Sequence, residues 1–108
     1  MFLLENMPHG VHLAVCGEID IATAPGLKDA IALAGDGNER VILSLDRCTY
    51  LDSSCLTVIY KARKALGDRL WIVVDPASHV RNIFRIAGVE AYLRIVASLA
   101  DIPLDVPA

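Results

Sequence analysis

The stretch between residues 41 and 66 constrains the fold more than any other, because it joins a strand to a helix within a few residues. Residues 41–45, Val-Ile-Leu-Ser-Leu, form a mainly apolar run that is typical of a buried strand. After Asp52-Ser53-Ser54, apolar side chains recur at steps of three and four residues, at Leu56, Ile59, Ala62, Ala65 and Leu66. This spacing predicts an amphipathic helix that begins at the Asp-Ser-Ser step.

Strands and helices alternate along the rest of the chain. The patterns predict strands at residues 2–5, 11–16, 41–45, 70–74 and 92–96, and helices at residues 23–34, 53–66, 78–87 and, briefly, 97–102. Strand–helix–strand connections are long crossovers, which make neighbouring strands parallel. The sequence of 108 residues therefore predicts one α/β domain with a mixed sheet, parallel in its middle and covered by helices. We expect its core to span about residues 2–102 and the tail, residues 103–108, to be flexible.

Two polar segments follow predicted strands. Residues 17–20, Gly-Glu-Ile-Asp, come after the second strand, and residues 47–54 come after the third. In α/β folds the loops at the carboxyl ends of parallel strands tend to carry the functional site. We therefore expect these two segments to share one end of the molecule.

Composition excludes several classes of function. The net charge of −3 argues against a nucleic-acid-binding protein, which normally has a basic face. Although 55% of the residues are hydrophobic, no apolar run approaches the roughly 18–20 residues that a membrane span needs. The first ten residues lack the pattern of a secretory signal. We therefore expect a cytoplasmic protein that does not insert into a membrane.

The chain offers no convincing catalytic, cofactor or metal site. His9, His12 and His79 form no local arrangement that would activate a serine, and no Gly-x-Ser-x-Gly elbow is present. No glycine-rich phosphate loop precedes a helix. Asp20, Asp46 and Asp52 could gather, but carboxylates near helix starts are ordinary capping residues. We expect neither enzymatic activity, nor a cofactor, nor a bound metal.

The three cysteines do not indicate a disulfide framework, because their number is odd and they lack CxxC spacing. We interpret all three as buried or half-buried reduced thiols: Cys16 at the end of a predicted strand, Cys48 in a predicted loop and Cys55 at the start of the helix. The alternative is a redox switch, for which Cys55 is the best candidate because a helix N-terminus favours the thiolate.

Ser53 and Ser54 remain as candidates for function. One of them could simply cap the helix, whose first N–H groups lack partners inside the helix. Alternatively, one hydroxyl accepts a phosphate, which brings about −1.5 to −2 charge at neutral pH. At a partner interface such a charge could switch association while leaving the fold intact.

Three motifs resemble those of a known family. They are Gly-Glu-Ile-Asp at residues 17–20, Leu-Asp-Ser-Ser at residues 51–54, and Val-Arg-Asn-Ile-Phe-Arg-Ile-Ala-Gly-Val at residues 80–89. In order and spacing they resemble a STAS domain, and more narrowly a bacterial anti-sigma factor antagonist. The resemblance spans nearly the whole chain. It implies a four- to five-stranded mixed sheet with helices packed chiefly on one side.

The resemblance also implies a function. An anti-sigma factor with serine kinase activity would bind the unmodified protein, release its sigma factor, and phosphorylate Ser53, which weakens the complex. A serine phosphatase would reverse this, and the protein itself would have no catalytic activity. The implied partner-binding residues are Asp20, Asp52, Ser53, Ser54 and Cys55, with Thr57 and Lys61 added from the phase of the helix.

Cys55 departs from the family pattern, which commonly has glycine after the two serines. Its Cβ and sulfur add bulk beside the phosphoacceptor. Two alternatives therefore stay open. One is a variant that binds without phosphorylation or is modulated by oxidation, and the other is a scaffold subunit of a transport or multi-protein signalling complex. Nucleotide binding by the domain itself finds no support in the sequence.

Overall fold

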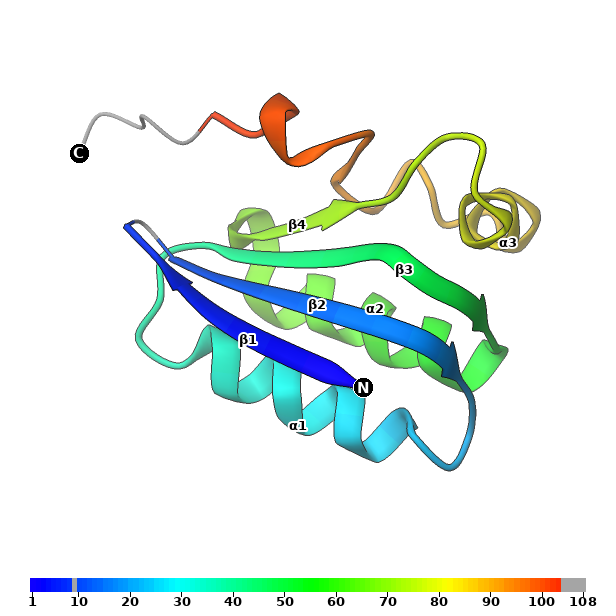
Figure 1. Cartoon of the computed structure of the whole chain (residues 1–108), viewed down its shortest axis with the longest axis horizontal. Helices are drawn as coiled ribbons and strands as arrows, with labels where there is room; N and C mark the ends of the chain where they lie inside the picture. The colour runs from blue at the N-terminus through cyan, green and yellow to red at the C-terminus, as the bar shows by residue number, and fades with distance from the viewer. Residues whose placement is uncertain (9, 104–108) are drawn as a thin grey trace.

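A five-stranded sheet runs through the molecule in the order β1-β2-β3-β4-β5 (Figure 1). The structure, a computed structural model, describes residues 1–8 and 10–103. The strands are β1 (Phe2–Met7), β2 (Gly10–Ile19), β3 (Val41–Leu51), β4 (Leu70–Val73) and β5 (Ile95–Val96). The hairpin β1–β2 is antiparallel and every other pair is parallel, which confirms the predicted mixed sheet.

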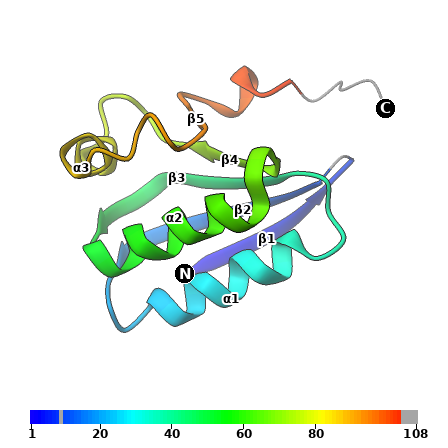
Figure 2. The ribbon, with the colours of Figure 1, turned by 180° about the vertical axis from the view of Figure 1, so that it is seen from behind.

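The helices are α1 (Ala24–Gly35), α2 (Ser53–Leu66) and α3 (His79–Ala87), with short 3₁₀ turns at η1 (Gly67–Arg69) and η2 (Leu99–Asp101). Figure 2 shows α1 and α2 lying side by side across one face of the sheet. This arrangement confirms the prediction that helices cover chiefly one side. None of the helices in the described part of the chain is long and apolar enough to cross a membrane.

The main core lies between the sheet and the two long helices. Alternation in β2 sends Val11, Leu13 and Val15 into this core, as their spacing predicts, while the intervening side chains face the other side. Leu27 of α1 and Ile59 of α2 are fully buried against them. On the opposite face, a smaller cluster around Trp71 is covered by Leu99 and Ile102, which follow β5.

Two strands extend beyond their predicted ends. β2 continues to Ile19 and β3 to Leu51, so Cys16 and Cys48 lie within strands, and the prediction of a loop around Cys48 was wrong. The two strands stay paired past residue 45 because irregularities between Ala14 and Cys16 and between Gly17 and Glu18 restore their register. Long-range pairing therefore overrides a polar local sequence.

The chain after β4 contains less regular secondary structure than predicted. The fifth strand is limited to Ile95–Val96, because Tyr92 and Leu93 donate their amides to Val89 in a turn. The predicted terminal helix is the single turn η2. The predicted flexible tail lies, after residue 103, outside the described residues.

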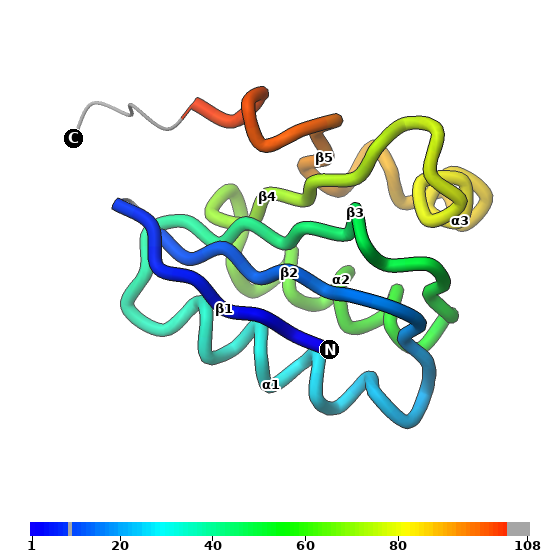
Figure 3. Tube along the Cα trace, in the orientation of Figure 1, coloured from blue at the N-terminus to red at the C-terminus, as the bar shows by residue number. Residues whose placement is uncertain are grey.

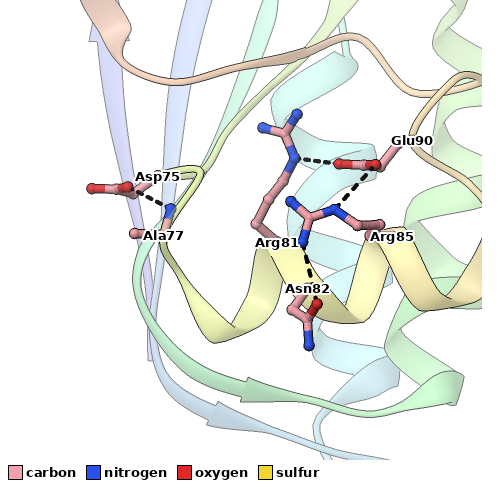
Figure 4. Close-up of polar contacts among 6 residues, drawn as sticks. All are labelled: Asp75, Ala77, Arg81, Asn82, Arg85 and Glu90. Carbon is pink, nitrogen blue, oxygen red and sulfur yellow. Dashed lines mark hydrogen bonds and ion pairs between the residues drawn. The ribbon is translucent and has the colours of Figure 1, made fainter.

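Helix α3 stands at the edge of the fold, beside the end of β3 (Figure 3). The Ser78 hydroxyl accepts the amide of Val80 at its start, and Gly88 ends it in the left-handed conformation (φ 74°). Arg81, near the start of the helix, and Arg85, near its end, both contact the carboxylate of Glu90, as Figure 4 shows. These contacts hold the helix in place while leaving its outer face free.

Candidate functional site

The start of α2 lies at one end of the sheet, against the end of β2 and the loop that follows it. The Asp52 amide donates to the carbonyl of Ile19 (3.3 Å), and the Cys55 thiol donates to the carbonyl of Asp20 (3.4 Å). The end of β2 and the start of α2 therefore touch, which confirms the expectation that residues 17–20 and 47–54 share one end. In Figure 1 this end also carries α3.

Asp52 caps α2. Its Oδ1 accepts the amides of Ser54 (3.0 Å) and Cys55 (3.2 Å) and also the hydroxyl of Ser54. Chiefly because of that hydroxyl, and also because of the two amides, the pKa of the Asp52 carboxyl lies below its ordinary value. The interpretation in which Ser53 or Ser54 caps the helix is therefore wrong.

Ser53 is the exposed residue of the pair. The described residues offer its hydroxyl no hydrogen-bond partner, and only its carbonyl is engaged, by the hydroxyl of Thr57 (3.0 Å). Ser54 is half-buried and its hydroxyl is bound to Asp52. Of the two serines, Ser53 alone presents a free hydroxyl at the surface.

Cys55 does not belong to the surface. Its side chain is fully buried, and burial raises the pKa of its thiol, which opposes the effect of the helix N-terminus. The interpretation of Cys55 as a buried reduced thiol is therefore confirmed, whereas the prediction that it contacts a partner was wrong. A sulfur at this position fills the core beneath the helix start, where glycine would leave a gap.

The remaining predicted residues lie around Ser53 in different ways. Asp20 is exposed, but its Oδ1 accepts the amides of Ala22 (2.9 Å) and Thr23 (3.2 Å), so it shapes the loop before α1. Thr57 and Lys61 are exposed on α2, as the helical phase predicts. They point away from α3, towards α1, since both line the space between the two long helices.

Sequence reasoning missed an apolar hollow beside Ser53. It has a volume of about 290 Å³ and is lined by Tyr50, Leu56, His79, Ile83, Ile86 and Ala87 together with residues 51–53. Tyr50 is 44% exposed and Ile86 is 78% exposed, and Ile21 in the adjoining loop is 75% exposed. The outward position of Ile86 in α3, out of phase with buried Val80 and Phe84, was the available signal.

The arrangement can act in recognition. No group of three or more His, Cys, Asp or Glu residues in the described part of the chain is placed to hold a metal ion. What this end presents is a free hydroxyl, a carboxylate already engaged by the helix, and exposed apolar side chains. Surfaces of this kind bind proteins.

The Asp52 cap gives a testable dependence on pH. A carboxyl whose pKa is lowered by folding stabilises the protein above its unfolded pKa, and this contribution is lost as pH falls through the folded pKa. We expect Asp52→Ala to melt at a lower temperature than the wild type at neutral pH, and the gap to close below about pH 4. Thermal melts across pH check this. Asp46→Ala, at an exposed position on β3, is the control, and a constant gap would contradict the assignment.

Comparisons with known proteins agree with the fold. The family model described as "Mlab, STAS domain" matches residues 2–97. An anti-sigma-B factor antagonist from Staphylococcus aureus is 25% identical over 84 residues, which cover 75% of this chain and 78% of that protein. The crystal structure of an anti-sigma factor antagonist from Mycobacterium paratuberculosis superposes with a TM-score of 0.82 at 27% identity, covering 94% of this chain and 88% of that one.

A third relative was solved in a modified state. It is the Bacillus cell fate determinant SpoIIAA in its phosphorylated form, with a TM-score of 0.65 at 18% identity, covering 91% of this chain and 93% of that one. At 18% identity, this superposition shows that the two chains share a fold and nothing more. The family model spans most of the chain and shows that the chain belongs to the STAS domain family.

Proposed function

We propose that this protein binds an anti-sigma factor through the end of the sheet that carries Ser53, and that phosphorylation of Ser53 switches binding off. The single observation that carries the proposal is the free, exposed hydroxyl of Ser53 beside an apolar hollow. The relatives of this chain that are named as anti-sigma factor antagonists supply the class of partner that we propose for it. The proposed setting is the cytoplasm, where a serine kinase with ATP and a serine phosphatase would act on it.

The apolar side chains around Ser53 supply the proposed affinity. The hollow is lined by Tyr50 of β3 and Ile86 of α3, together with Ile83 and Leu56. Exposed aromatic and aliphatic side chains beside a cavity are typical anchors at interfaces, because their burial removes apolar surface from water. A docked partner would thus exclude water from the Ser53 hydroxyl.

The Ser54 and Cys55 amides at the start of α2 are not free to neutralise a phosphate on Ser53. The amides of Ser54 and Cys55, which an anion at a helix start would otherwise use, already donate to Asp52. The carboxylate of Asp52 would instead repel the new charge. The phosphate would therefore stay in water in the free protein, and its desolvation on docking would weaken the complex.

Phosphorylation is tested with the kinase-type anti-sigma factor and ATP, followed by mass spectrometry of the peptide around residue 53. We expect phosphate on Ser53 and none on Ser54, whose hydroxyl is occupied by Asp52. Ser53→Ala should abolish labelling. Modification of Ser54, or stable binding that ATP never alters, would contradict the switch; the latter result would favour the scaffold-subunit alternative.

A further inference from the structure

A hollow between the two long helices has no role in the proposed switch. This α1–α2 groove has a volume of about 330 Å³ and is lined by Lys28, Ile31, Ala32, Thr57, Val58, Lys61, Ala62, Ala65 and Leu66. We propose that the α1–α2 groove receives Leu33 of a second copy of this chain, so that two copies associate through α1.

Short side chains create the groove. Ile31 and Ala62 are buried at its base, whereas Ala32 and Ala65 on either side are exposed but too short to fill it. The helices are close at its end, because a Cβ on Gly35 would lie 2.8 Å from Cδ2 of Leu66. The space is therefore preformed by the packing of α1 on α2, and it is wide enough for a branched aliphatic side chain.

The rim of the α1–α2 groove is basic although the chain as a whole is acidic. Lys28 on α1 and Lys61 on α2 both line it, and the residues that line it include no carboxylate. Neither lysine takes part in an ion pair among the described residues. The overall net charge is −3, so this rim is a local exception. An apolar side chain flanked by carboxylates is the complementary occupant.

This chain carries such an occupant on the same helix. Leu33 is 65% exposed on α1, and Asp29 lies one turn before it and Asp36 one turn after it, both exposed. Neither carboxylate belongs to an ion pair of the described residues. A leucine between two acids thus matches a groove between two lysines in both shape and charge.

A two-fold axis makes the contact mutual. Under that symmetry Leu33 of each copy enters the groove of the other, so the same patch serves both partners. The patch spans few residues, so the interface falls among the small, weak ones, with dissociation in the micromolar to millimolar range.

Sedimentation equilibrium of the wild-type chain from micromolar to millimolar concentration tests the proposal. We expect the average mass to rise from one chain towards two, less steeply at high salt, which screens the charges. Leu33→Glu should raise the dissociation constant at least tenfold. Ile86→Glu, on α3 and outside the lining of the groove, should leave it unchanged, which separates this contact from the proposed switch.

Charge reversal identifies the partner surface. Lys28→Glu with Lys61→Glu makes the groove acidic, and Asp29→Lys with Asp36→Lys makes the flanks of Leu33 basic. Each double variant should be monomeric alone, because its groove and its own flanks then carry the same sign. An equal mixture of the two should form a dimer, because both contacts are then attractive.

Two outcomes would overturn the proposal. One is a wild-type chain that stays monomeric at millimolar concentration. The other is self-association that Leu33→Glu does not weaken while circular dichroism shows the variant folded. All the substituted positions are exposed, so loss of the fold is not the expected cause of any change.

Discussion

Ser53→Asp is expected to raise the dissociation constant for the anti-sigma factor by ten- to a hundredfold while leaving the melting temperature almost unchanged. The substitution places a charge beside Asp52 and at the edge of the apolar hollow. An opposed or desolvated charge at an interface costs several kcal/mol, and about 1.4 kcal/mol is a factor of ten in affinity. Titration calorimetry and thermal melts of the same preparations measure both quantities.

Ser53→Ala and Ser53→Asn are the matched controls. Both keep the position neutral and should bind within a few-fold of the wild type. Ser53→Ala should also retain its stability, because the side-chain cap of α2 is Asp52 and not Ser53. Equal weakening by aspartate and asparagine would indicate a steric effect and would contradict the electrostatic account.

Phe84→Ala is expected to lower the free energy of unfolding by about 3–5 kcal/mol, the largest effect on stability that we predict. Phe84 is the largest fully buried side chain, and with Val80 it is one of the two buried residues of α3. Its removal leaves a cavity where α3 meets the core. Total stabilities of small domains are about 5–15 kcal/mol, so urea unfolding should show a clear loss.

Ile86→Ala, two residues further on, separates stability from binding. Ile86 is 78% exposed, and its truncation should change the free energy of unfolding by no more than about 0.5 kcal/mol. In the proposed function it should nevertheless weaken binding of the anti-sigma factor. A stable Phe84→Ala variant would contradict the assigned packing of α3, whereas unaltered binding by Ile86→Ala would remove the hollow from the partner surface.

Much of the site followed from local sequence. The Asp-Ser-Ser step marks the start of α2 because a short polar side chain there satisfies helix amides, and the structure assigns this role to Asp52. Helical phase correctly placed Thr57 and Lys61 at the surface. The exposure of Ser53 agrees with its predicted role, which stays a proposal until phosphorylation is measured.

The family resemblance misplaced Cys55 at the partner surface, and local sequence did not reveal the hollow beside Ser53. The motif implies that Cys55, after the two serines, lies at the surface, yet its thiol donates to the carbonyl of Asp20 in the neighbouring loop. Tyr50 and Ile86 are 36 residues apart in the chain. They line one hollow only because α3 packs beside the end of β3. Periodicity identifies an exposed side chain but not its neighbours.

By itself the sequence determined the order of strands and helices, the buried face of each, and the polar step that begins α2. These depend on contacts within a few residues, where periodicity and capping act. Only the tertiary structure decided how far β2 and β3 pair, that Cys55 is buried, and which apolar side chains surround Ser53. Those outcomes depend on packing between segments distant in the chain, which local patterns do not encode.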